Sequence, residues 1–303
     1  MPVESGRREF SAGTILGGRF RIVRAVGHGG MGVVYEAIDQ KLERRVALKC
    51  AQPGHRHHLS PEASAAREVS HFNVCKVYDL HTFGTPMGEI DCISMEFIEG
   101  ETLAGRIRRS GPPSPREALD IARQICAGMA QAHRQQVIHG DLKGANVMLS
   151  QSADKGLRAV ITDFGLARIE GNAATRVLAG GTYDYMAPEQ LLGQPATVAS
   201  DLYALGVLFH VMLTGWPPAR GNPLASPPEQ APAGPELPTV TLDYAIREAD
   251  WHRKIADIPA PWKRVVARCL AARPEDRPLS ADAVASALQP RRRLLNGTAA
   301  AMV

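Results

Sequence analysis

The sequence predicts an α+β fold with two lobes, a small one rich in β-strands and a larger one rich in α-helices. Up to about residue 98, apolar residues alternate with polar ones, which is typical of strands. Beyond that point they recur with helical spacing. At Ile98–Gly100 neither period holds, so we expect a linker there. The 303 residues suffice for two lobes of roughly 100–200 residues each.

These changes of pattern also set the expected boundaries. We expect an N-terminal leader at 1–19, the small lobe at 20–98, the large lobe at 99–289 and a flexible tail at 290–303. Residues 216–238, within the large lobe, are rich in Pro, Gly and Ala, which is typical of an irregular surface insertion.

Composition restricts the classes of function. A net charge of +4 is too small to argue for nucleic-acid binding. The five cysteines lie far apart without a CxxC pair, which argues against a disulfide framework or a zinc site and fits a reducing cytoplasm. No apolar run reaches the ~18 residues of a membrane span, and the first ten residues lack the apolar core of a signal peptide. We therefore expect a soluble, cytoplasmic chain.

In the small lobe, alternation predicts five strands and one helix. Ser60 is a suitable N-cap, with Pro61 at the first helical position and Glu62 in the first turn, so a helix is expected from there to about Ser70. The strands are expected at Phe20–Val26, Val33–Ile38, Arg45–Lys49, Val74–Leu80 and Ile90–Phe97.

In the large lobe, the helical period is clearest at Pro115–Gln135 and in the strongly apolar run Asp201–Thr214. A loop is expected at 166–186. The remaining expected elements are short strands at Val147–Leu149 and Ala159–Ile161, and helices at Trp251–Ile255, Ala260–Leu270 and Ser280–Leu288.

The glycine-rich run Gly27–Gly32 has strand patterns on both sides, whereas a dinucleotide-binding fold would place a helix directly after the glycines. The run therefore predicts a hairpin whose tip offers backbone N–H groups to phosphates. Lys49 ends an apolar strand, where a buried ammonium needs an anionic partner. A lysine that reaches water from the strand edge fits the same pattern.

Three further motifs complete the set: HGDLKGAN at His139–Asn146, DFG at Asp163–Gly165 and APE at Ala187–Glu189. In this order and spacing the motifs resemble those of the eukaryotic-type protein kinases, in particular the Ser/Thr group found in bacteria. The resemblance spans about Phe20 to Leu288 and implies the bilobal protein-kinase fold. It also implies transfer of the ATP γ-phosphate to Ser/Thr hydroxyls of proteins, the chain itself included, for which two copies would meet as a dimer.

The resemblance implies an ATP site formed by the glycine-rich loop and the residues around the adenine. Met95 corresponds to the gatekeeper, and the backbone of Glu96 and Ile98 to the hinge that binds adenine. Ala47 and Leu149 correspond to the pair that sandwiches it. The remaining residues expected to bind the nucleotide are Val26, Gly27, His28, Gly29, Gly30, Met31, Gly32, Val34 and Lys49.

The resemblance also assigns catalytic roles. Asp141 is expected to accept or orient the substrate hydroxyl proton, and Lys143 to steady the γ-phosphate. Lys49 is expected to contact the α- and β-phosphates. Its partner would be Glu62, with Glu68 as the alternative. The residues expected to hold Mg²⁺ through hard oxygen atoms are Asn146 and Asp163.

The sequence departs from the family at Gly140, where an Arg is usual. That Arg normally meets a phosphorylated residue of the activation loop, so we expect weak dependence on phosphorylation at Thr175 or Thr182. HGD followed by four residues and Asn also occurs in small-molecule kinases similar to aminoglycoside and choline phosphotransferases. The segment through Met186 to Glu189 and the helix after it favour a protein kinase. A scaffold that only binds ATP is a further alternative.

Overall fold

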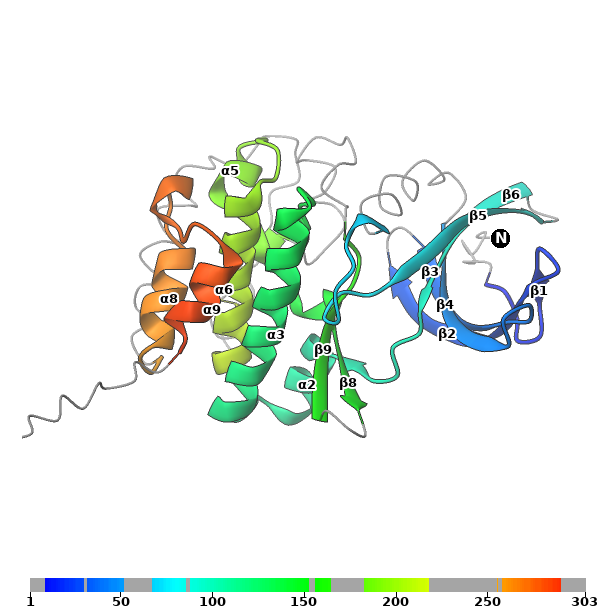
Figure 1. The fold of residues 1–303 in the computed structure, drawn as a ribbon, viewed down its shortest axis with the longest axis horizontal. Coiled ribbons are helices and arrows are strands. Elements are labelled where there is room, and N and C mark those ends of the chain that lie inside the picture. Colours follow the sequence, from blue (N-terminus) through cyan, green and yellow to red (C-terminus); the bar gives the residue numbers. More distant parts are fainter. Residues whose placement is uncertain are drawn as a thin grey trace, which may run out of the picture.

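The computed structural model describes residues 9–29, 32–51, 67–85, 88–152, 156–164, 183–217, 255 and 258–289. Strands fill one end of the molecule and helices the other, and a single segment after β6 leads from one lobe to the other (Figure 1). This arrangement confirms the predicted α+β fold with two lobes.

The small lobe is one curled antiparallel sheet in the order β1-β2-β3-β4-β6-β5. Its outer core contains Phe20, Tyr35 and Leu48, from three adjacent strands. The strands are β1 (Ile15–Leu16), β2 (Phe20–Gly29), β3 (Gly32–Asp39), β4 (Arg44–Ala51), β5 (Val77–Thr85) and β6 (Gly88–Glu96).

One predicted strand, Val74–Leu80, begins later than expected. Val74 forms only an isolated parallel bridge with Ile161. The N–H of Cys75 donates to the Ile161 carbonyl at 2.8 Å, and the N–H of Ile161 donates to the Asn73 carbonyl at 2.9 Å. The first apolar residues of this run therefore contact the large lobe, and β5 begins at Val77.

Residues 9–19 fold onto the sheet although they show no strand or helix pattern. Ile15 and Leu16 pair with β2. The N–H of Phe10 donates to the Tyr35 hydroxyl at 3.1 Å, and the two rings lie 5.7 Å apart. The expected leader at 1–19 therefore contains residues that pair with the sheet and pack on it. Two paired residues are too few to show a period.

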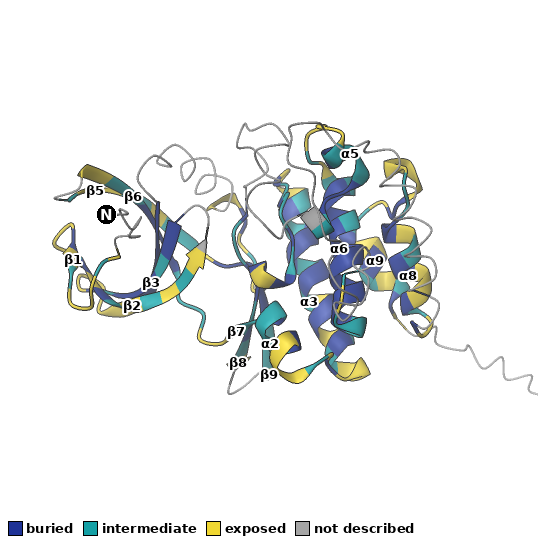
Figure 2. Ribbon diagram, turned by 180° about the vertical axis from the view of Figure 1, so that it is seen from behind, coloured by how far each residue is buried: buried dark blue, intermediate teal, exposed yellow. Residues whose placement is uncertain are grey.

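The large lobe packs its helices around α6, which is buried on nearly all sides (Figure 2). A three-stranded sheet, ordered β7-β8-β9, faces the small lobe. The elements are β7 (Glu101–Thr102), α2 (Leu103–Ser110), α3 (Pro115–Arg134), η2 (Gly144–Asn146), β8 (Val147–Ser152), β9 (Gly156–Ile161), η4 (Tyr183–Tyr185), α5 (Pro188–Leu191), α6 (Val198–Thr214), α8 (Trp262–Cys269), η5 (Pro274–Asp276) and α9 (Ala281–Ala287).

Local sequence explains where these helices begin and end. Ser114 caps α3 by accepting the N–H of Glu117, and Pro115 occupies the first position. A capping box between Thr197 and Ser200 starts α6. Gly215, at φ 87°, ends it in the left-handed conformation. The short α2 was not predicted, because eight residues show barely two turns of periodicity.

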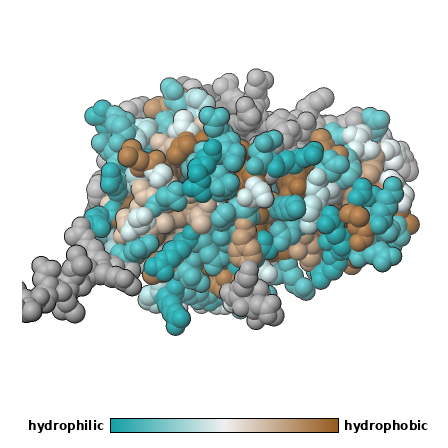
Figure 3. All heavy atoms as spheres, viewed as in Figure 1, coloured by the Kyte–Doolittle hydropathy of each residue, from teal (hydrophilic) through white to brown (hydrophobic). Residues whose placement is uncertain are grey.

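Several predictions lie outside the described residues. They concern most of the helix at 60–70, most of the loop at 166–186, the insertion beyond residue 217 and most of the helix at 251–255. In the part that is described, no helix is long and apolar enough to cross a membrane. The face drawn in Figure 3 mixes hydrophilic and hydrophobic residues.

Two of the five cysteines form a disulfide, contrary to the prediction. Cys50 on β4 and Cys92 on β6 lie opposite each other in register, with their Cα atoms 4.1 Å apart. Sequence spacing could not reveal the pair, because strand register alone brings together residues 42 positions apart. The other three, Cys75, Cys126 and Cys269, are free and buried.

A buried ion pair ties α5 to the end of the large lobe. Arg277, whose side chain is 0% exposed, meets both carboxylate oxygens of Glu189 at 2.6 and 2.7 Å. Its guanidinium also donates to the carbonyls of Ala199, Ala271 and Ala272. Nearly every donor of this buried cation is therefore satisfied.

Removing the negative partner should destabilise the fold. We expect Glu189→Gln to lower the free energy of unfolding by about 3 kcal/mol, because Arg277 would stay buried without its counter-charge. Chemical denaturation followed by circular dichroism measures this loss. The matched control is Glu101→Gln, which removes an exposed ion pair with Arg109 and should change stability little.

The Glu189–Arg277 pair also predicts how the difference in stability between wild type and Glu189→Gln depends on pH. Burial alone would raise the pKa of Glu189, but Arg277 holds it below the ordinary 4.5. The stabilisation is therefore complete above about pH 4.5 and is lost as the pH falls through the lowered pKa. A gap between wild type and Glu189→Gln that stayed constant well below that range would contradict this assignment.

Candidate active site

Three of the predicted site residues lie on one tight loop. Lys143 Nζ lies 2.8 Å from Asp141 Oδ2. The turn η2 brings Asn146 back to the same residue, where its amide nitrogen donates to the Asp141 carbonyl at 2.9 Å. The other carboxylate oxygen, Asp141 Oδ1, is buried and has no hydrogen-bond partner among the described residues. This loop therefore presents a buried acceptor atom beside a lysine ammonium.

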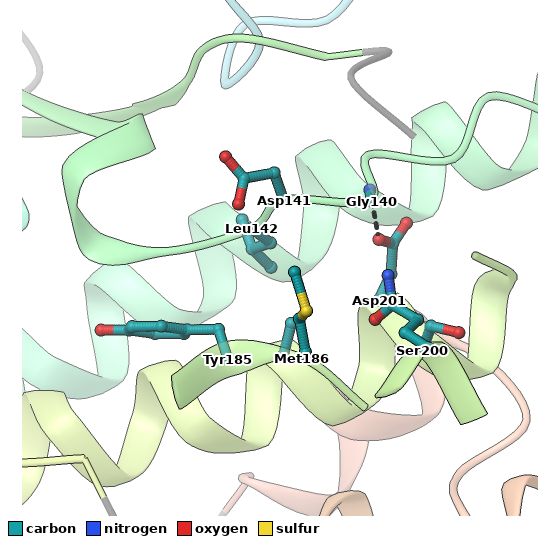
Figure 4. A pocket seen from close by; sticks show the side chains of 9 residues that line it. Gly140, Asp141, Leu142, Tyr185, Met186, Ser200 and Asp201 are labelled. Atoms are coloured by element: carbon teal, nitrogen blue, oxygen red, sulfur yellow. Dashed lines mark hydrogen bonds between the residues drawn. The ribbon is translucent and has the colours of Figure 1, made fainter. Parts of the chain in front are cut away.

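A buried aspartate from α6 holds the start of this loop. Asp201 is 1% exposed and accepts two backbone N–H groups, from His139 at 2.9 Å and from Gly140 at 2.8 Å (Figure 4). His133 Nε2 lies 2.9 Å from the same carboxylate. Gly140 has φ 73°, where a glycine is at ease and other residues are strained.

The role of Asp201 was not recognised in the sequence. The usable signal was an acid in the first turn of a helix that is otherwise apolar on every side. A carboxylate in that position needs donors, and the backbone N–H groups of a nearby loop are suitable ones.

His139 links the loop to the strand β9. Its Nδ1 accepts the N–H of Asp141 at 3.2 Å, so Nε2 carries the ring proton and donates it to the Thr162 carbonyl at 3.0 Å. The imidazole also packs against Phe164, with ring centroids 4.7 Å apart. One histidine thus contacts the catalytic loop and the two residues on either side of Asp163.

Lys49 crosses from the small lobe to Asp163 of the large lobe, at 2.7 Å. Burial alone would raise the pKa of Asp163, but the Lys49 ammonium holds it below its ordinary value. Lys49 is therefore an interior lysine with an anionic partner, not an edge lysine. Glu62 lies outside the described residues, and Glu68 is exposed, which does not favour it as a partner for buried Lys49.

Asn146 and Asp163 stand at the adjoining ends of two paired strands. The N–H of Thr162 donates to the Asn146 carbonyl at 2.9 Å, next to the register pair Val147 and Ile161. The Asn146 amide nitrogen is engaged by Asp141, which turns its oxygen the other way. Amide and carboxylate oxygens are ligands that Mg²⁺ accepts, and the backbone segments that carry these two residues lie next to each other. In the described part of the chain, no group of three or more His, Cys, Asp or Glu could hold a metal.

The predicted adenine pocket is an apolar cluster between the lobes. Ala47 and Met95 are buried in it, with Val34 and Ile98 packed against them. Met148 lies in this cluster, whereas Leu149 lies in the core of the large lobe. Leu149, which was expected to contact adenine, therefore lies outside this cluster, and Met148 lies in it. Strand alternation could have predicted this, because the side chain two residues after Asn146 lies on the same face of the strand as that of Asn146.

The glycine-rich run forms the hairpin that the sequence predicted, with Gly27 opposite Val34, His28 opposite Val33 and Gly29 opposite Gly32. Val26 is partly exposed at its base. A Cβ at Gly32 would collide with the backbone carbonyl of Cys50, so strand packing requires this glycine. The tip, Gly30 and Met31, lies outside the described residues.

Beneath Asp141, a small cavity of about 10 Å³ separates the loop from α6, which is room for about one water molecule. Figure 4 shows Tyr185 and Met186 beneath the loop, on the segment that leads into α5. Burial raises the pKa of Tyr185 to about 12, so its phenol stays protonated near neutral pH.

Comparison with known proteins agrees with this geometry. The family model described as the protein kinase domain matches residues 20–288. The chain is 39% identical to the serine/threonine-protein kinase pkn2 of Myxococcus xanthus over 218 residues, which cover 68% of this chain and 26% of that protein. It is 32% identical to PknB of Mycolicibacterium smegmatis over 273 residues, covering 86% of this chain and 41% of PknB.

A solved structure supports the fold. The PknI kinase domain of Mycobacterium tuberculosis superposes with a TM-score of 0.64 at 23% identity, over 92% of this chain and 98% of that chain. The chain spans well under half of the length of its curated relatives, from 26% of pkn2 to 41% of PknB.

The contact of Gly140 with Asp201 can be tested by adding one methyl group. Gly156, at φ 70° in open space, is the matched control, and Gly156→Ala should cost about 1 kcal/mol through backbone strain alone. Gly140→Ala should cost about 1 kcal/mol more, because the shifted loop also weakens a hydrogen bond to a buried carboxylate. Urea denaturation measures both. Equal costs would mean that Asp201 does not hold the loop.

Proposed function

This chain belongs to the protein kinase family, and on that premise we propose that it transfers the γ-phosphate of ATP to serine and threonine hydroxyls of proteins, itself included. The observation that carries the proposal is the assembly of Asp141, Lys143 and Asn146 next to the Lys49–Asp163 ion pair. Lys49 comes from strand β4 of the small lobe, and the other four residues come from the large lobe. A nucleotide between the lobes would therefore meet all of them. Transfer between two copies would require them to meet as a dimer.

The chemistry follows from charge and position. The transferred phosphoryl group carries negative charge, so catalysis depends on placing cations and on aligning the hydroxyl. In our proposal Asp141 Oδ1 receives or orients the hydroxyl proton, and Lys143 stabilises charge on the phosphoryl oxygens. Lys49, which is paired with Asp163, would contact the other phosphates. The residues that would hold Mg²⁺ are Asn146 and Asp163, and the bound ion would neutralise phosphate charge.

The adenine would lie between Ala47 and Met148, with Met95 at the back of the pocket. The N–H of Glu96 is already bonded to the Lys76 carbonyl at 2.8 Å, so Glu96 would offer its carbonyl to the adenine amino group. Ile98 would offer its N–H. The glycine hairpin would cover the phosphates with backbone N–H groups.

Loss of Asp141 should abolish transfer. With Mg²⁺ and labelled ATP, we expect the wild type to label itself and a generic basic protein, and Asp141→Asn to reduce the rate by about 10³-fold or more. The control is Asp120→Asn, an exposed aspartate on α3, which should leave the rate unchanged. Nucleotide binding without any transfer would favour an ATP-binding scaffold instead. Transfer to small molecules but not to proteins would favour the rival phosphotransferase class.

Activity should depend only weakly on phosphorylation of the activation loop. Gly140 lacks the arginine side chain that would bind a phosphorylated residue, and the buried Asp201 already holds the catalytic loop. We expect Thr175→Ala to stay within about tenfold of wild-type turnover, and phosphatase treatment to have a similarly small effect. A fall beyond about 100-fold for Thr175→Ala would contradict this. Thr182→Ala is less diagnostic, because Thr182 can shape the peptide site directly.

A further inference from the structure

We infer that Arg158 is a positioning residue for the nucleotide, which clamps the hinge to the strand that leads to Asp163. The inference rests on the proposed use of ATP and adds a residue to which the catalytic motifs assign no role. Arg158 lies on β9 of the large lobe and contacts Glu96, the last residue of β6, after which the chain passes to the large lobe (Figure 1).

The first half of the clamp is a two-pronged ion pair with the hinge. Arg158 meets the two carboxylate oxygens of Glu96 at 2.5 and 3.3 Å. The side chains are only 18% and 25% exposed, so solvent screens the pair less than a surface one. Glu96 is the residue whose carbonyl would receive the adenine amino group, so the guanidinium fixes the hinge where the base would bind.

The second half of the clamp is the segment that precedes β5. Arg158 donates two hydrogen bonds to the Phe72 carbonyl, at 2.8 and 3.0 Å. Its guanidinium also lies 4.6 Å from the centre of the Phe72 ring. Only a planar, forked cation can satisfy a carboxylate, a carbonyl and an aromatic face together, which is why lysine is a poor replacement. The exposed ring of Phe72 is therefore covered on one face by the Arg158 guanidinium.

The register of β9 extends this clamp toward the catalytic residues. Arg158 and Val160 are two residues apart, so they share one face of the strand. Val160 packs in the apolar cluster that contains Met95, while Arg158 holds Glu96, the next residue of the hinge. Asp163 follows three residues after Val160. One strand therefore positions residues at both the proposed adenine site and the proposed phosphate site.

A second arginine holds the hinge from the small lobe, but more weakly. Arg45 stacks on Phe97 at 4.4 Å and meets Glu99 at 3.2 Å. Because Glu99 is 79% exposed, that ion pair contributes little. Arg158 is therefore the stronger link, and it is the one that joins the hinge to the large lobe.

This placement predicts that Arg158 affects nucleotide affinity more than turnover. Without the guanidinium, Glu96 would keep a half-buried charge without its partner, and the hinge would shift to hydrate it. The groups that act on the transferred phosphoryl, Asp141 and Lys143, are held by Asp201 and not by the clamp. Saturating ATP should therefore restore most of the rate.

The test compares Arg158→Met and Arg158→Lys with Arg109→Met, which removes an arginine from an exposed ion pair with Glu101. Calorimetry gives the Kd for Mg-ATP, and steady-state kinetics with a generic basic protein separates KM from kcat. We expect Arg158→Met to raise the Kd and the KM for ATP about tenfold and to keep kcat within about threefold of the wild type. Arg158→Lys should fall between it and the wild type, and Arg109→Met should match the wild type.

Other outcomes would overturn the inference. An unchanged Kd in Arg158→Met, beside a wild type that binds ATP, would refute the clamp and leave the proposed function intact. Equal losses in kcat and kcat/KM, without a change in Kd, would assign Arg158 to the chemical step instead. A wild type that binds no ATP would refute the proposed function and the inference with it.

If Arg158→Met does not fold, Glu96→Gln keeps the shape of the hinge and weakens the same pair. It should raise Kd in the same direction but by less, because the Phe72 contacts remain. An unchanged Kd in Glu96→Gln would then overturn the clamp.

Discussion

The active site depends on one buried carboxylate. A charge as deeply buried as that of Asp201 is tolerated only when donors surround it, and here two consecutive backbone N–H groups and a histidine supply them. Because Asp201 belongs to the best-buried helix of the large lobe, its position is set by the core. The loop that carries Asp141 is bonded to Asp201 through its backbone N–H groups. Its position therefore does not depend on the rotamer of any loop side chain.

A short series of contacts connects the loop held by this carboxylate to the small lobe. The imidazole of His139 connects the loop to the Thr162 carbonyl, and the next residue, Asp163, meets Lys49 of the small lobe. Each step is a hydrogen bond or an ion pair in a partly buried place, where unpaired groups are costly. The lobes therefore meet through a short polar chain as well as through the apolar cluster around Met95.

The sequence predicted the parts that have a period or a motif. Five strands, the long helices and the glycine hairpin were found in this way. What failed depends on register or on distant partners. The strand face decides that Met148, and not Leu149, joins the adenine cluster. Sheet pairing brings Cys50 to Cys92, and folding of α6 brings Asp201 to Gly140. The last two contacts do not follow from local spacing, because tertiary structure creates them, whereas strand alternation alone could have identified Met148.

Gly140 shows why the loop can do without the usual arginine. An arginine–phosphate contact exists only after modification and lies near solvent, where salt screens it. The Asp201 contact needs only the folded helix, and a glycine at φ 73° lets the N–H reach the carboxylate without strain. The position of the catalytic loop is then set by the folded core of the large lobe. The Lys49–Asp163 pair and the Arg158–Glu96 pair both join the small lobe to the large one. A change at either contact would therefore alter how the lobes meet and leave the contact between Asp201 and the catalytic loop in place.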